Sequence, residues 1–197
     1  YHTFTDFYDE HFDSIRDNVS SLLEIGILRG ASLRMWHDYF INAQIYGIDI
    51  DEWKHGALNF NFKEKRINAY NCSCENVDKF KTLFDNKLFD IVCDDGSHTI
   101  KHQLESIANY FKYVKPGGYY ILEDLHTSFI PKYTKDEDIT TYDVIYRAQK
   151  TKEVIKTRYF NNNQHEYLQK NIDWITIYQK NPEVFTDSIT CIIKKVK

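Results

Sequence analysis

The pattern of hydrophobic and polar positions changes its period several times along the chain. Short runs rich in aliphatic and β-branched residues alternate with segments in which apolar residues recur every three or four positions. The first pattern is typical of buried strands and the second of amphipathic helices. Strands that alternate with helices form right-handed crossovers, so this order predicts a mainly parallel sheet. The predicted strands cover residues 21–26, 44–50, 66–70, 88–94 and 118–123, and the clearest helices cover 32–40, 75–84 and 99–113.

The last third of the chain departs from this alternation. Residues 125–163 are polar and aromatic, with one segment of helical period at about 140–156. Two apolar runs follow at 174–178 and 188–193, too close together for a helical crossover, so they are expected to pair antiparallel. We therefore predict an α/β fold with a Rossmann-like, doubly wound sheet of seven strands, mostly parallel and closed by an antiparallel hairpin. Residues 125–163 are expected to form a lid that contacts an acceptor.

The composition fits one domain and argues against several classes of protein. The 197 residues are enough for a single hydrophobic core, and 42% of them are apolar. A net charge of −4 gives no broad basic surface for nucleic acid or an anionic membrane. No apolar run approaches the roughly 18 residues that a membrane span needs. We expect residues 1–197 to be one domain, and, because the sequence starts at Tyr1 rather than Met, a module taken from a longer polypeptide.

The four cysteines indicate a reducing compartment. Cys72, Cys74, Cys93 and Cys191 have neither a paired metal-binding spacing nor the density of a disulfide framework. Free thiols and a cytoplasmic location are therefore expected. The sequence leaves the oligomeric state open, with a homo-oligomer among the alternatives.

The first two strands end in residues that suit a nucleotide-like ligand, which binds beyond the carboxyl ends of parallel strands. Glu24 ends the first strand, and Gly26 and Gly30 allow the following turn to approach a ligand closely. Ser32 then opens a helix, and Asp49 ends the second strand, where a carboxylate can accept hydrogen bonds from both ribose hydroxyls. The turn lacks the third glycine of the dinucleotide fingerprint, and Glu24 would repel a pyrophosphate. The pattern therefore favours S-adenosylmethionine (SAM), which carries a sulfonium and an ammonium group, over NAD.

Four acidic residues follow the next two strands. Asp94 and Asp95 end the fourth strand, and Glu123 and Asp124 end the fifth, which is expected to lie beside it. Because adjacent strand residues point to opposite faces, Asp94 can face the cofactor and Asp95 the acceptor. Acids this close repel one another unless they share a cation, and hard oxygen ligands suit Mg²⁺ or Mn²⁺. His98 follows over the same site, and its ordinary pKa of about 6.5 suits a general base.

Several blocks of the sequence together resemble one enzyme family. The class I, metal-dependent SAM O-methyltransferases that act on macrolide deoxysugars, typified by the mycinamicin and tylosin pathway enzymes, are similar over roughly residues 1–128. The resemblance implies the class I methyltransferase fold and a Mg²⁺ ion bound by Asp95, Glu123 and Asp124, with His98 as the base. It also implies SAM contacts from Glu24, Gly26, Ser32, Asp49 and Asp94. The blocks that carry it are residues 23–26, 45–50, 94–98, 115–118 and 123–128.

One block departs from the family. After the third strand the family tends to have Gly-Asp-Gln, whose acid meets the adenosine, whereas residues 69–73 read Ala-Tyr-Asn-Cys-Ser here. We expect Asn71 to make the adenine contact instead.

The expected acceptor is a hydroxyl of a glycan, a nucleotide sugar or another small molecule, because neighbouring sugar hydroxyls can chelate a metal. Tyrosines of the expected lid would stack on sugar rings, although they could simply pack. His126 is interpreted as a second base, a substrate contact or a loop residue, and His102 as a supporting or surface residue. The tyrosines are Tyr133, Tyr142, Tyr146 and Tyr159.

The function we expect is methyl transfer from SAM to a sugar hydroxyl. Two alternatives belong to other classes. A Tyr-x-x-x-Lys spacing at residues 146–150 would fit an NAD-dependent sugar oxidoreductase, and a methyltransferase fold without activity would serve as a binding module.

Overall fold

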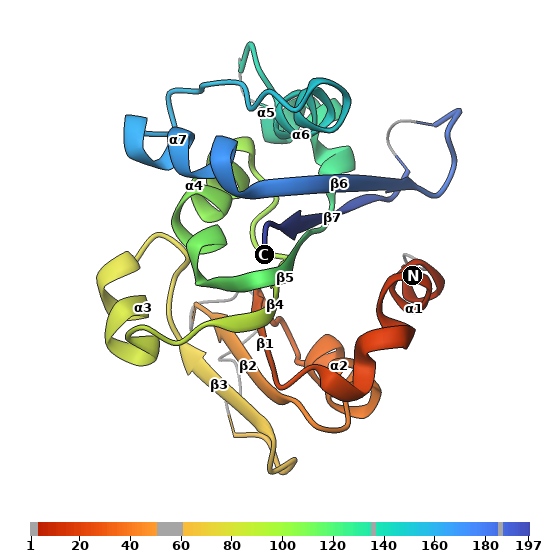
Figure 1. Cartoon of the computed structure of the whole chain (residues 1–197), viewed down its shortest axis with the longest axis vertical. Helices are drawn as coiled ribbons and strands as arrows, with labels where there is room; N and C mark the ends of the chain where they lie inside the picture. The colour runs from red at the N-terminus through yellow and green to blue at the C-terminus, as the bar shows by residue number, and fades with distance from the viewer. Residues whose placement is uncertain (1–3, 51–60, 135–136, 185–186) are drawn as a thin grey trace.

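A seven-stranded sheet runs through the middle of the molecule in the computed structural model, which describes residues 4–50, 61–134, 137–184 and 187–197 (Figure 1). Its strand order is β3-β2-β1-β4-β5-β7-β6. β1 to β5 pair in parallel, and β7 runs antiparallel to both of its neighbours. The predicted α/β fold with a closing antiparallel hairpin is confirmed. The strands are β1 (Ser21–Ile25), β2 (Gln44–Asp49), β3 (Ile67–Asn71), β4 (Phe89–Asp94), β5 (Val114–Leu122), β6 (Ile172–Gln179) and β7 (Ile189–Lys195).

Helices cover both faces of this sheet. Figure 1 shows α1 and α2 on one side and α3, α4 and α7 on the other. Within the described ranges, no helix combines the length and the apolar character needed to cross a membrane. The helices are α1 (Thr5–Phe12), α2 (Ala31–Tyr39), α3 (Val77–Phe84), α4 (Ile100–Tyr110), α5 (Pro131–Thr134), α6 (Thr141–Thr151) and α7 (Asn162–Asn171), with short 3₁₀ helices η1 (Asp13–Asn18), η2 (Phe111–Tyr113) and η3 (Leu125–Phe129).

The hydrophobic pattern does not indicate α7, nor the early start of β5. Leu168 is the buried residue of α7, so an apolar stripe is missing from its sequence. A capping box defines the start of α7 instead, because Asn161 and Gln164 exchange side-chain-to-backbone hydrogen bonds. β5 begins at Val114 rather than at residue 118, since Pro116 lies where its pairing with β4 shifts register, a position that tolerates proline.

Strand residues alternate between two apolar cores, one on each face of the sheet. Leu22 packs with residues of α1 and α2, whereas Leu23 packs with residues of α3, α4 and α6. The same alternation decides where the acids at the strand ends lie. Glu24 and Glu123 continue the face covered by α1 and α2, and Asp94 continues the opposite face. These three acids therefore do not lie on one face of the sheet.

Residues 125–134 and 137–163, the described part of the segment that we expected to form a lid, are folded onto the domain. They contain η3, α5 and α6. α6 begins with a capping box in which Thr140 and Asp143 exchange hydrogen bonds. Val144 and Ile145 of α6 are buried in the core that includes α4. This packing places the segment next to the carboxyl ends of β4 and β5, from which it starts.

Replacing Phe80 by alanine should destabilise the fold strongly. Phe80 is fully buried, and its ring centroid lies 4.4 Å from that of Tyr110, 4.8 Å from Tyr113 and 4.7 Å from Phe84. The cavity left by Phe80→Ala should lower the free energy of unfolding by about 3–5 kcal/mol, measured by urea denaturation. Exposed Lys79→Ala should change it by less than about 0.5 kcal/mol. Equal midpoints for the two variants would contradict this assignment of the core.

Candidate active site

The carboxyl ends of β1, β4 and β5 form one continuous edge. Asp95 N donates a hydrogen bond to Ile25 O at 2.9 Å, and Glu123 N donates to Asp94 O at 2.9 Å. Backbone pairing thus continues beyond the strands themselves. As we expected, the acidic residues after β4 and β5 lie side by side, and they lie next to the turn that follows β1.

Three side chains converge at this edge. Asp95, His98 and Asp124 each offer one ligand atom, and these atoms lie within 4.8 Å of one another. His98 Nε2 lies 3.5 Å from Asp124 Oδ2. His98 and Asp124 adopt left-handed backbone angles, with φ of 59° and 55°, which are uncommon for residues other than glycine. Thr127 Oγ1 fixes both turns, because it donates to His98 O at 2.9 Å and to Asp124 O at 2.8 Å.

Two carboxylates concentrate negative charge in this group, and two histidines lie within 3.7 Å of Asp124. Asp124 Oδ1 is buried and accepts no hydrogen bond from the described residues, and His126 Nδ1 lies 3.7 Å away. Burial, followed by repulsion from Glu123, raises the pKa of Asp95 well above its usual range. A divalent cation with hard oxygen ligands would relieve both problems, so the donor set fits Mg²⁺ or Mn²⁺.

Glu123 lies beside the three converging residues but outside their group. Tyr8 OH, on α1, donates to Glu123 Oε1 at 2.6 Å, and the Cys93 thiol lies 3.9 Å from the same oxygen. Burial raises the pKa of Tyr8 well above its usual value, so the phenol keeps the proton that it donates. Burial also raises the pKa of Glu123, which the Tyr8 hydrogen bond opposes. The assignment of Glu123 as a metal ligand stays a prediction.

The turn after β1 packs against the loop after β4. Gly26 has φ of 86°, and a side chain there would collide with the Asp95 carbonyl and with Gly96. Glu24, which is 1% exposed, accepts a hydrogen bond from Ser32 Oγ at 2.9 Å. Burial raises the pKa of Glu24 to about 8. Glu24, Gly26 and Ser32 are therefore brought together, as we expected for a ligand-binding turn.

Gly30 lies directly before α2, two residues ahead of Ser32. It is the N-cap residue, with φ of 72°, and a side chain there would collide with the Phe62 ring. Gly30 thus shapes the turn through its conformation and through close packing.

Asp49 has a second role that the sequence did not indicate. Its Oδ2 accepts from Ile27 N at 2.8 Å and from Leu28 N at 2.9 Å, so it holds the turn after β1. Ile50 N donates to the other oxygen, Oδ1, at 2.7 Å. Because a carboxylate can accept about four hydrogen bonds, this leaves capacity for about one further bond from a ribose. Asn71 ends β3 next to Asp49 and is exposed. Ribose binding by Asp49 and adenine binding by Asn71 remain predictions.

Asp94 points into the opposite core. It is 4% exposed, and its Oδ2 accepts from Tyr120 OH at 3.2 Å while its Oδ1 accepts from Gly96 N at 3.3 Å. Burial raises the pKa of Asp94 to about 6. Asp94 supports the loop that carries Asp95, and its predicted contact with SAM is left untested.

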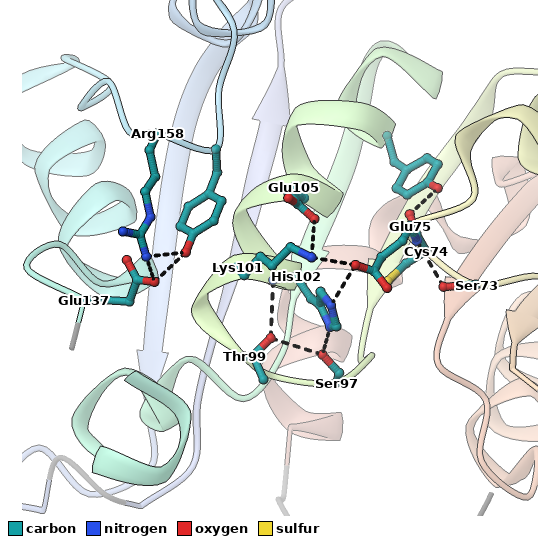
Figure 2. A network of polar contacts seen from close by, with 12 residues as sticks. Ser73, Cys74, Glu75, Ser97, Thr99, Lys101, His102, Glu105, Glu137 and Arg158 are labelled. Carbon is teal, nitrogen blue, oxygen red and sulfur yellow. Dashed lines mark hydrogen bonds and ion pairs between the residues drawn. The ribbon is translucent and has the colours of Figure 1, made fainter. Parts of the chain in front are cut away.

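A polar network connects this loop to the start of α3 (Figure 2). His102 Nδ1 is hydrogen-bonded to Ser97 Oγ, and His102 Nε2 lies 3.3 Å from Glu75 Oε1. Lys101 Nζ also lies 2.6 Å from Glu75 Oε1. His102 is therefore a supporting residue, one of the two interpretations given above. Sequence reasoning missed Glu75 and Tyr8, because each meets its partner only after folding.

A family profile described as a methyltransferase domain matches residues 23–125, more than half of the chain. The chain belongs to this methyltransferase family. The chain is 37% identical over 151 residues to demethylmacrocin O-methyltransferase of Streptomyces fradiae. It is 36% identical over 144 residues to mycinamicin VI 2''-O-methyltransferase of Micromonospora griseorubida. Each match covers 70% of this chain but only 35% of the relative, so the chain spans about a third of their length.

Solved structures agree with this membership. MycE methyltransferase from the mycinamycin biosynthetic pathway, in complex with Mg, SAH and mycinamycin VI, superimposes with a TM-score of 0.73 at 28% identity. The superposition covers 98% of this methyltransferase and 50% of MycE. An O-methyltransferase from Bacillus cereus, at 12% identity and a TM-score of 0.57, shares the fold alone. The resemblance inferred from the sequence blocks, including the class I methyltransferase fold, is confirmed.

The raised pKa of Glu24 predicts that the methyltransferase loses stability as the pH rises. A folded state that holds a proton more tightly than the unfolded chain is favoured at low pH, and this advantage disappears as the pH passes the folded-state pKa, about 8 for Glu24. Glu24→Gln should therefore reduce the fall in the free energy of unfolding between about pH 5 and pH 9. Urea denaturation in EDTA measures it. Exposed Glu10→Gln should keep the wild-type profile, and an unchanged Glu24→Gln profile would contradict the assignment.

Proposed function

We propose that this methyltransferase domain transfers the methyl group of SAM to a hydroxyl of a sugar, in a glycan or a glycosylated small molecule, with the help of Mg²⁺ or Mn²⁺. The relatives named above support this proposal, since their names specify O-methylation of demethylmacrocin and of mycinamicin VI and the MycE complex contains Mg and SAH. Because the chain spans only part of those relatives, the activity is proposed from the residues that it does contain.

The convergence of Asp95, His98 and Asp124 carries the proposal. Asp124 Oδ1 is buried and receives no hydrogen bond from the described residues, which is costly unless a positive group lies nearby. With Glu123 beside them, Asp95 and Asp124 would hold the cation. A bound divalent cation would supply a Lewis acid that lowers the pKa of an acceptor hydroxyl.

His98 is the proposed general base. Its Nε2 lies 3.5 Å from Asp124 Oδ2, so the imidazolium formed by accepting the hydroxyl proton would be stabilised by a carboxylate. The left-handed backbone at His98, held by Thr127, keeps the ring over the acids. His126, which lies near Asp124 Oδ1, would support the same carboxylate rather than act as a second base.

The donor would bind along the ends of β1 and β2. Glu24 would face the ammonium group, the turn from Gly26 to Ser32 would approach the SAM chain, and Asp49 would accept the ribose hydroxyls. Gly30, Asn71 and Asp94 complete the proposed contacts from α2, β3 and β4.

The acceptor would bind against the segment 125–163, the proposed lid. Tyr146 of α6 is 44% exposed, and its ring stacks on that of Tyr142 with centroids 5.6 Å apart. An exposed tyrosine of this kind offers an aromatic face to a sugar ring.

Thermal unfolding and methyl-transfer assays test the proposed chemistry. SAM or SAH should raise the melting temperature, because a ligand that binds only the folded state stabilises it, whereas NAD should not. Labelled SAM should transfer its methyl group to a panel of deoxysugar glycosides, and EDTA should abolish transfer until Mg²⁺ is restored. Stabilisation by NAD and not by SAM would favour the oxidoreductase alternative. Binding of SAM without transfer to any acceptor of the panel would favour the inactive binding module.

His98→Ala should remove the base and leave the donor site intact. We expect turnover to fall about 10²–10⁴-fold, while the dissociation constant for SAH, measured by calorimetry, stays within about twofold of wild type. The control is His37→Ala, on α2 and away from the acid group, which should retain activity. A fully active His98→Ala enzyme would exclude the base assignment.

A further inference from the structure

Tyr8 makes a contact that connects the first described helix with the proposed cation site. Its hydroxyl donates to Glu123 Oε1 at 2.6 Å across 115 positions of sequence. The Tyr8 side chain is only 4% exposed, and its ring centroid lies 5.2 Å from that of Trp36. Tyr8 is thus held by the core between α1 and α2, and its hydroxyl has a fixed position.

The two oxygens of Glu123 have different surroundings. Both hydrogen bonds that the described residues donate to this side chain, from Tyr8 and from Cys93, end on Oε1. Oε2 accepts neither of them. Glu123 directly precedes Asp124, and its N donates to Asp94 O at 2.9 Å, so its side chain starts beside the three-residue group.

We propose that Tyr8 is a positioning residue for Glu123: its hydroxyl holds Oε1 and so directs Oε2 to the cation held by Asp95 and Asp124. The inference rests on the proposed function, because it assigns Glu123 a place at that cation. Carboxylates that bind metals usually accept such a hydrogen bond on the other oxygen, which fixes their orientation. The docking of α1 on the sheet then becomes part of the cation site, although α1 contributes no residue to the three-residue group.

Binding of Mn²⁺ tests this role without any acceptor. The free Mn²⁺ signal in electron paramagnetic resonance gives the dissociation constant of the whole chain in the presence of SAH. Tyr8→Phe removes one hydroxyl and keeps the ring among its aromatic neighbours, so folding should be preserved, as circular dichroism would verify. We expect its dissociation constant to rise about 10–100-fold, the usual effect of losing a partner of a metal ligand.

Tyr39→Phe is the matched control. Tyr39 OH, on α2, donates to Asp9 Oδ1 on α1 at 2.9 Å, so this variant also removes a phenol-to-carboxylate bond that ties α1 to the domain. Its affinity for Mn²⁺ should stay within about twofold of wild type. A loss equal to that of Tyr8→Phe would mean that loosening of α1 causes the effect, and would overturn the proposal.

A double-mutant cycle with Glu123→Gln isolates the contact. If Tyr8 acts through Glu123, Tyr8→Phe should have no further effect in the Glu123→Gln background. An equal loss of affinity in both backgrounds would overturn the proposal. Unchanged Mn²⁺ affinity of Tyr8→Phe would also overturn it. Neither result would contradict the proposed function. If the wild-type chain binds no Mn²⁺, the proposed cation site is wrong, and so is the proposed role of Tyr8.

Discussion

Crowding of carboxylates at the carboxyl edge of the sheet is the constraint on which the rest of the site depends. Backbone pairing continues past the ends of β1, β4 and β5, so the acids that follow are held together despite their mutual repulsion. The chain compensates most of them separately: Glu24, Asp94 and Glu123 each accept a hydrogen bond from a neighbouring hydroxyl. Asp124 keeps one buried oxygen to which no residue in the described ranges donates. The unfavourable charge is thus concentrated near Asp124, where the proposed cation would stabilise it most.

Much of this arrangement could be predicted from the sequence, because parallel sheets obey simple geometric rules. Apolar runs located all seven strands, and the carboxyl ends of neighbouring strands must meet at one edge. That rule is sufficient to bring Asp124 next to Asp95 and His98, which lie 29 and 26 residues before it in the sequence. It also joins Glu24 to the turn at Gly26, since both belong to one strand end.

The remaining features depend on side-chain orientation and on contacts distant in sequence. The bond between Tyr8 and Glu123 exists only because α1 packs beside α2, and no periodicity in the sequence indicates that packing. Asp49 could be assigned to a ligand from its place at a strand end, but its bonds to the turn after β1 depend on the path of that turn. α7 was missed because its polar sequence is stabilised by capping rather than by burial.

The close approach of Gly26 to the Asp95 carbonyl has a consequence for how the proposed activity could diversify. Two loops in backbone-to-backbone contact have no intervening side chains through which one could shift while the other stays in place. The turn of the proposed SAM site and the loop of the proposed cation site would therefore have to change together. Adaptation to acceptors of different size and shape would have to occur elsewhere, at exposed positions of α6 such as Tyr146, because Thr127 at the start of the same segment holds the His98 and Asp124 turns.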